Sequence, residues 1–144
     1  LSESIRTWQR EGQSVELTTL LDQAAAIRTP VPIFDANHPS LLPPGDMPKR
    51  IATLCIDADA PAPDSPAGFA RSILESLAEA YATAIADAER LSSQKINIVH
   101  IVGGGSQFVT EIILDIGSER LERSCENDSK QLKTSLWEEA AETG

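Results

Sequence analysis

Aromatic residues are scarce in this chain of 144 residues: three Phe, two Trp and one Tyr make up 4% of it. A core with so few aromatic rings has to be built from Ala, Leu, Ile and Val, which favours helices that pack closely through small side chains. The length corresponds to one domain and excludes a complete two-lobed enzyme.

Basic residues are also in short supply, with 12 Lys and Arg against 22 Asp and Glu, for a net charge of −10. Such a chain repels the phosphates of nucleic acids and anionic lipid headgroups, so we expect neither a nucleic acid nor a membrane as a partner. No run approaches the roughly 18 apolar residues of a spanning helix. The two cysteines, Cys55 and Cys125, are far apart and no secretory signal precedes them, which predicts reduced thiols in a cytoplasmic protein.

Patterns typical of metal sites and catalytic thiols are missing. No HxxxH, CxxC or carboxylate cluster has metal-ligand spacing, so no protein-held metal is expected. His38 lies in DANHPS and is interpreted as part of a local turn network, and His100 as a packed core residue. Glu75 and Glu79 are predicted to form a solvated helix face.

Proline is absent outside residues 30–66, and this divides the chain into a helical opening, a proline-rich middle and a proline-free remainder. The opening predicts a helix over 1–11 with Gly12 at its C-terminal cap, and a second helix capped by Ser14 and stopped before Pro30. Because no capping residue precedes the first helix, we expect the chain to be a piece of a longer protein.

The middle predicts a loop over 31–47 that packs on the domain surface, because a solvated linker would leave its apolar side chains exposed to water. Asp46 is expected to cap a following helix that runs to about Ala60. The next helix is capped by Ser65 and starts at Pro66. Its apolar stripe is predicted to be Phe69, Ile73, Leu77, Tyr81 and Ile85, and its opposite, charged side Arg71, Glu75, Glu79, Asp87 and Glu89.

A short, β-branched apolar run, 96–102, predicts a buried strand, and Gly103, Gly104 and Gly105 follow it directly. Glycines at this point let a ligand approach the backbone, and a nucleotide is the ligand we would expect there. A tight strand-to-helix turn explains the three glycines equally well. Neither a P-loop nor the dinucleotide fingerprint is present.

The last 37 residues differ in composition, with nine acidic and four basic residues over 108–144. Residues 109–116 (VTEIILDI) fit a second strand or a β-branched helix, and their pattern does not separate the two.

Three separated segments carry a resemblance to a known family. They are residues 32–51 (PIFDANHPSLLPPGDMPKRI), 66–85 (PAGFARSILESLAEAYATAI) and 96–107 (INIVHIVGGGSQ), and the opening 1–12 (LSESIRTWQREG) agrees with them. In this order and spacing they resemble the C-terminal lobe of the FGGY carbohydrate kinase family, in its rhamnulokinase branch. The resemblance implies an α/β fold, a fragment of an actin-like ATPase (ribonuclease H-like) lobe, mostly helical with one or two strands.

The resemblance also implies an activity for the complete enzyme: transfer of the γ-phosphoryl group of ATP, bound with Mg²⁺, to the 1-hydroxyl of L-rhamnulose. By the same resemblance the adenine and ribose side of the ATP pocket corresponds to Gly103, Gly104, Gly105, Ser106 and Gln107. The sugar would bind through a lobe that this chain lacks.

The resemblance stops at Gln107, where Phe108 replaces an asparagine of the family pattern. We therefore expect residues 1–107 to form a partial kinase lobe and 108–144 a divergent acidic tail. The family's phosphate-binding segments and catalytic aspartate are not found, so no catalytic residue is predicted and the isolated chain is expected to be inactive. Either the chain is part of a kinase, or it is a non-catalytic remnant that acts as a binding or interaction module. The unpaired edges of strand 96–102 predict self-association.

Overall fold

A computed structural model describes residues 1–96. They form the helices α1 (Ser2–Arg10), α2 (Leu17–Ala25), α3 (Met47–Asp57) and α4 (Pro66–Ser92), with a short 3₁₀ helix η1 (Pro39–Leu41). No strand occurs within these 96 residues, so the predicted α/β class is not confirmed there. The strand expected over 96–102 (except Ile96), the glycine segment and the acidic tail lie outside the described residues.

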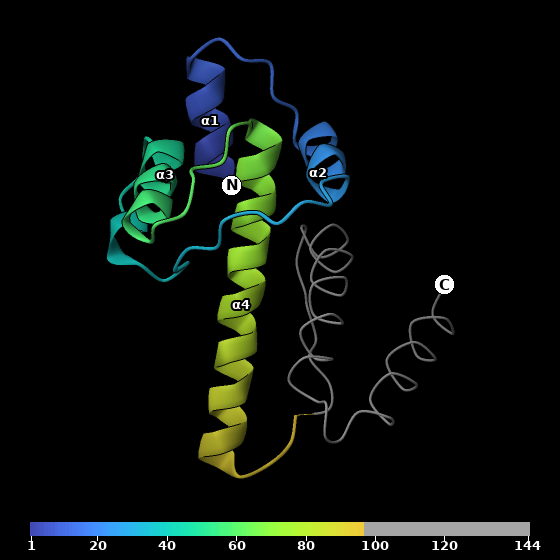
Figure 1. Ribbon diagram of the computed structural model, residues 1–144, viewed down its shortest axis with the longest axis vertical. Helices are drawn as coiled ribbons and strands as arrows, with labels where there is room; N and C mark the ends of the chain where they lie inside the picture. The colour runs from blue at the N-terminus through green and yellow to red at the C-terminus, as the bar shows by residue number, and fades with distance from the viewer. Residues whose placement is uncertain (97–144) are drawn as a thin grey trace, which may run out of the picture. The chain divides into compact units, whose positions relative to one another are not determined.

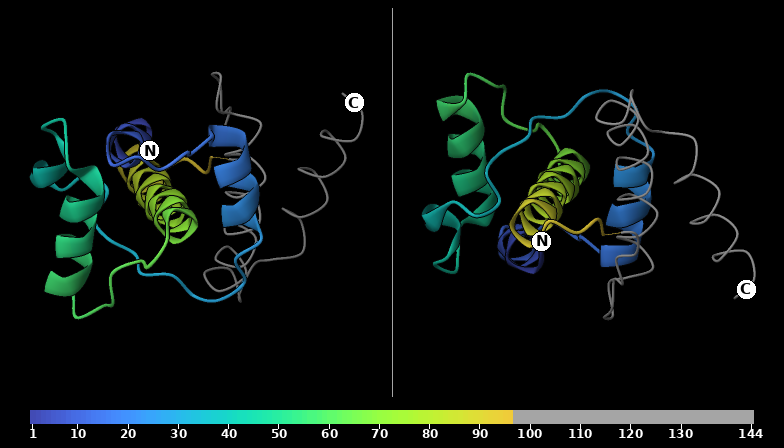
Figure 2. Two further views of the ribbon diagram at one scale, coloured as in Figure 1. Left: turned by 90° about the horizontal axis from the view of Figure 1, so that it is seen from above. Right: turned by 90° about the horizontal axis from the view of Figure 1, so that it is seen from below.

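The chain divides into two compact units, 1–84 and 85–144, and the first contains α1, α2, α3 and the larger part of α4. In this first unit α4 runs between α3 on one side and α2 on the other, with α1 beside its first turns (Figures 1 and 2). The buried residues of α4 lie between Gly68 and Ala78. These turns of α4 are thus the centre about which the shorter helices pack.

Two clusters of buried side chains fill the unit. One joins Trp8 of α1, Leu20 and Ala24 of α2 and Ala70 of α4, and the Trp8 ring lies 6.0 Å from that of Phe69, centroid to centroid. The other consists of Phe34, Ile51, Cys55 and Ile73. Residues 70–74 are buried in succession, so these turns of α4 are buried on more than one side, and the predicted division into an apolar and a charged face is wrong there. Tyr81, predicted for the apolar stripe, is 55% exposed.

Arg71 and Glu75 show the consequence for α4. Their side chains are only 11% and 17% exposed, and Arg71 Nε lies 2.7 Å from Glu75 Oε1. One oxygen of Glu79 is also inaccessible to solvent. The face predicted to be solvated therefore contains a largely buried ion pair. Burial of these two charges is possible because each neutralises the other.

The predicted boundaries of α1 are confirmed to within one residue at each end. Gly12 follows its last turn with φ +86°, and its N–H donates to the Gln9 carbonyl at 3.1 Å. A residue without a Cβ adopts this left-handed conformation at little cost.

The predicted cap of α2 is wrong, because Ser14 lies too far before the first helical residue, Leu17. Glu16 caps the helix instead: its carboxylate accepts from the backbone N–H of Thr18 at 3.1 Å and of Thr19 at 2.8 Å. These donors, the Thr19 contact first, lower the pKa of Glu16 to about 2. The negative charge also suits the positive end of the helix.

The loop before α3 packs on the unit as predicted, with Phe34 in the second buried cluster. Two serines one helical turn apart on α4 hold its backbone: Ser72 donates to the Pro32 carbonyl, and the Phe34 N–H donates to Ser76 Oγ at 3.1 Å. The turn network around His38 is also confirmed, since His38 Nδ1 lies 2.8 Å from Ser40 Oγ.

α3 starts as predicted but lacks the predicted side-chain cap and ends earlier. Asp46 has φ +46° and makes no side-chain cap bond. An N-cap carboxylate needs an extended backbone to reach the first turn, and Pro48 offers it no N–H. The helix ends at Asp57, three residues before the predicted end at Ala60.

Arg50 of α3 reaches back to the proline-rich turn before the helix. Its Nη1 donates to the carbonyl oxygens of Pro43 and of Ser40, the latter at 3.2 Å, and its Nη2 to that of Pro44 at 3.3 Å. One guanidinium therefore holds residues 40–44 against α3.

In α4, Ser65 caps the first turn as predicted, with its Oγ 3.1 Å from the Gly68 nitrogen.

Candidate functional site

The residues predicted to contact adenosine, Gly103, Gly104, Gly105, Ser106 and Gln107, all lie outside the described residues. Within the described part, polar side chains gather in an open groove between α1 and the turn before α3. We call it the α1 groove; it is lined by Glu3, Arg6, Gln9, Arg10, Pro44 and Gly45.

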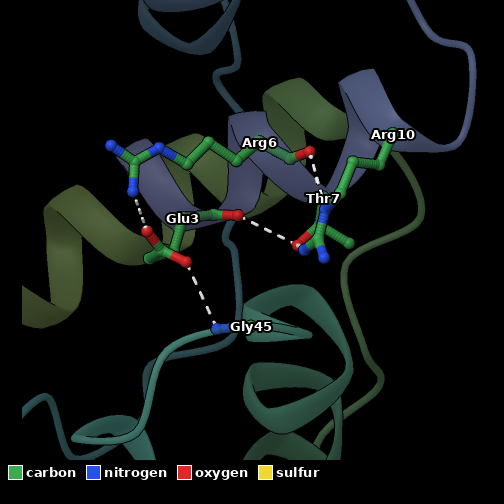
Figure 3. A network of polar contacts seen from close by, with 5 residues as sticks. All are labelled: Glu3, Arg6, Thr7, Arg10 and Gly45. Atoms are coloured by element: carbon green, nitrogen blue, oxygen red, sulfur yellow. Dashed lines mark hydrogen bonds and ion pairs between the residues drawn. The ribbon is translucent and has the colours of Figure 1, made fainter.

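Glu3 connects the two walls of the α1 groove (Figure 3). Its Oε1 lies 2.5 Å from Arg6 Nη1, and its Oε2 accepts from the Gly45 N–H at 3.2 Å. The Gly45 N–H and the Arg6 guanidinium, in this order, lower the pKa of Glu3 below its usual range. Glu3 is therefore a carboxylate at neutral pH.

Arg10 forms another part of the groove, one turn beyond Arg6 on α1. Its Nε donates to the Arg6 carbonyl at 3.3 Å, and its Nη2 donates to Thr7 Oγ1 at 3.1 Å. Figure 3 shows the guanidinium of Arg10 beside Thr7, while that of Arg6 lies on the far side of Glu3. Gln9 donates its side-chain N–H to the Val15 carbonyl at 3.2 Å, which fixes its amide at the helix end.

Sequence reasoning did not find this groove. The spacing of Glu3, Arg6 and Arg10 marks one polar face of a helix, which ordinarily indicates a solvated surface. The opposite wall comes from Gly45, 42 residues away, and no sequence pattern joins the two.

The remaining reactive groups of the described part offer no second site. Cys55 is fully buried, and burial raises the pKa of its thiol, which is the opposite of activation. Among residues 1–96, no group of three or more His, Cys, Asp and Glu side chains could hold a metal ion. No helix in that part is long and apolar enough to cross a bilayer.

Comparison with known proteins identifies the family. The profile of the FGGY family of carbohydrate kinases, C-terminal domain, matches residues 1–114. The chain belongs to this family. Its membership confirms the resemblance seen in the sequence and assigns the matched residues to the C-terminal lobe of an actin-like ATPase fold.

Two curated relatives of this FGGY family chain are rhamnulokinases. The one from Klebsiella pneumoniae is 35% identical over 98 residues, which cover 68% of this chain and 20% of the relative. The one from Halalkalibacterium halodurans is 32% identical over 83 residues, covering 56% of this chain and 18% of the relative. The matched part of the chain thus spans about a fifth of the length of these relatives.

Proposed function

We propose that the chain is the C-terminal part of a rhamnulokinase-like carbohydrate kinase and that Gly103–Gln107 supply the adenosine side of its ATP site. The family match carries this proposal, because it extends over residues 1–114 and so includes the glycine segment. The two rhamnulokinase relatives support the choice of sugar.

The glycines suit this role for a steric reason. Three residues without a Cβ leave the backbone open, so a flat base or a ribose can lie directly against it. This wall binds and orients the nucleotide but bears none of the charge that develops at the phosphorus.

Chemistry at the γ-phosphoryl group requires further parts. The bond from the 1-hydroxyl oxygen of L-rhamnulose to phosphorus forms as the bond from phosphorus to the leaving oxygen of ADP breaks, and a base takes the hydroxyl proton. We assign that base, the phosphate-binding groups and the Mg²⁺ that accompanies ATP to the complete enzyme. The 144-residue chain alone is therefore expected to be inactive, and L-rhamnulose-dependent ADP release by the pure chain would contradict this.

A chimera tests whether this chain can serve as the C-terminal part of a rhamnulokinase and whether its glycine segment contacts ATP. Residues 1–107 of this chain would replace the aligned segment of the Klebsiella pneumoniae rhamnulokinase, and ADP release would be measured with ATP and L-rhamnulose. We expect an active chimera in which Gly104→Val raises the KM for ATP by about tenfold or more, because a β-branched side chain blocks the approach of the nucleotide.

Ala82→Val is the matched control, since Ala82 is exposed on α4. It should leave the KM for ATP unchanged. An equal KM in the Gly104→Val chimera would refute the assignment of the glycine segment. A folded but inactive chimera would favour the alternative of a non-catalytic binding or interaction module.

A further inference from the structure

We propose that the α1 groove binds the phosphate group of a small ligand, and that Glu3 occupies the position of this group when the ligand is absent. The groove uses α1 and the turn before α3, and none of its residues belongs to the glycine segment. The groove is open to solvent, so a small phosphate-bearing molecule can reach its lining residues.

The charge of the groove differs in sign from that of the chain. Arg6 and Arg10 contribute two positive charges and Glu3 one negative charge, which leaves a positive excess in a chain of net charge −10. The Arg6 side chain is 71% exposed, so its guanidinium is accessible to a ligand. Guanidinium groups match the geometry of phosphate oxygens and bind them through paired hydrogen bonds.

Glu3 shows which donors an anion would use. One carboxylate oxygen lies against the Arg6 guanidinium and the other accepts the Gly45 N–H, so the structure already holds an anion between a cationic side chain and a backbone donor. A phosphate has more oxygens than a carboxylate and a higher charge near neutral pH. It can therefore take the same donors and compete with Glu3.

Gly45 leaves room for this exchange. Its φ is +84°, and a Cβ built on it would meet no atom within 4 Å, so the space beside its backbone is open. Glycine is readily accommodated at such a φ, and it lets a ligand oxygen approach the N–H closely. The turn is also anchored, because Arg50 binds the carbonyl oxygens immediately before Gly45.

The opposing charge of Glu3 gives the proposal its test. If Glu3 competes with the ligand, Glu3→Gln should tighten phosphate binding, whereas Arg6→Gln should weaken it. Arg90→Gln is a matched control, because Arg90 is 69% exposed and forms an i,i+3 ion pair with Asp87, and neither residue lines the groove.

The experiment titrates the 144-residue chain with sodium phosphate at pH 7, at constant ionic strength set by chloride, and follows the backbone amide of Gly45 and the Nε–H groups of the arginines by NMR. We expect saturable shifts at Gly45 and Arg6. Arg6→Gln should raise the Kd by about three- to fivefold, as loss of an accessible ion contact does, and Arg90→Gln by less than about twofold. The indole resonance of buried Trp8 reports that each variant is folded.

Further outcomes decide the matter. A parallel titration with acetate should bind more weakly than phosphate, and equal or tighter binding of acetate would overturn the phosphate assignment. Absence of saturable shifts in the wild-type chain, equal weakening by Arg6→Gln and Arg90→Gln, or weaker binding in folded Glu3→Gln would each overturn the proposal. Because inorganic phosphate carries no adenosine, its failure here leaves the proposed nucleotide segment unaffected.

Discussion

Replacing Ser76 by alanine tests how α4 holds the loop before α3. Ser76 is almost completely buried, and its Oγ accepts the backbone N–H of Phe34 at 3.1 Å, across 42 residues of sequence. Alanine removes the acceptor but hardly changes the volume. The Phe34 N–H is then buried without a partner, which costs about 1–3 kcal/mol. We expect the free energy of unfolding to fall by about 2 kcal/mol.

Urea unfolding followed by circular dichroism measures this loss. Ser92→Ala is a control on the same helix, because Ser92 is exposed and its hydroxyl makes only exposed contacts of 3.3–3.5 Å, with the Glu89 carbonyl and the backbone of Gln94. The control should change the free energy of unfolding by less than about 0.5 kcal/mol. In hydrogen exchange, the amide of Phe34 should lose protection in Ser76→Ala while other amides in the unit keep theirs. Equal stability of the two variants, together with an unchanged exchange rate at Phe34, would refute the reasoning.

Three further predictions follow from other contacts. Ile51→Ala, at a core position 2% exposed, should lower the free energy of unfolding by about 3 kcal/mol in urea, whereas Ile56→Ala, 62% exposed on the same helix, should cost less than about 0.5 kcal/mol; similar losses would contradict the packing described. The pKa of Glu16 is about 2 in the folded protein against an ordinary 4.5, so its carboxylate stabilises the fold above about pH 4.5, and this stabilisation is lost as the pH falls towards 2. Glu16→Gln should therefore lower the melting temperature at pH 7 and have the same melting temperature as the wild type near pH 2. A difference in melting temperature that does not change with pH would exclude the charge as its cause. The isolated chain should self-associate in sedimentation velocity runs through the strand predicted over 96–102, and a compact monomer with strongly protected amides over 98–102 would contradict this.

Local signals predicted most element boundaries, and the misses have identifiable causes. The start of α4 at Pro66 after Ser65, and the end of α1 before Gly12, depend on residues a few positions apart. The sequence alone therefore predicts both helix ends. The cap of α2 was missed because Glu is an uncommon N-cap and Ser14 is a common type placed too early. Asp46 makes no cap bond because its backbone is left-handed and not extended, as an N-cap residue requires.

Long-range features were not readable in the same way. The burial of Arg71 and Glu75 depends on α4 being packed on more than one face, which its own periodicity does not reveal. The α1 groove depends on the approach of Gly45 to Glu3 across 42 residues. The nucleotide segment Gly103–Gln107 was inferred from resemblance and stays a prediction.

The contacts of Arg50 have a consequence for how residues 40–45 can move. Prolines 43 and 44 supply carbonyl acceptors but no N–H donors, so this turn cannot build a hydrogen-bond ladder of its own. A single cation supplies the missing donors to three carbonyl oxygens. The turn is therefore held by two side chains, Arg50 at its carbonyl oxygens and Glu3 at the Gly45 N–H, so its freedom to move depends on these contacts and not on a backbone ladder. Arg50→Lys would leave fewer of these carbonyl oxygens bound, because a compact ammonium group cannot reach all three as the planar guanidinium does.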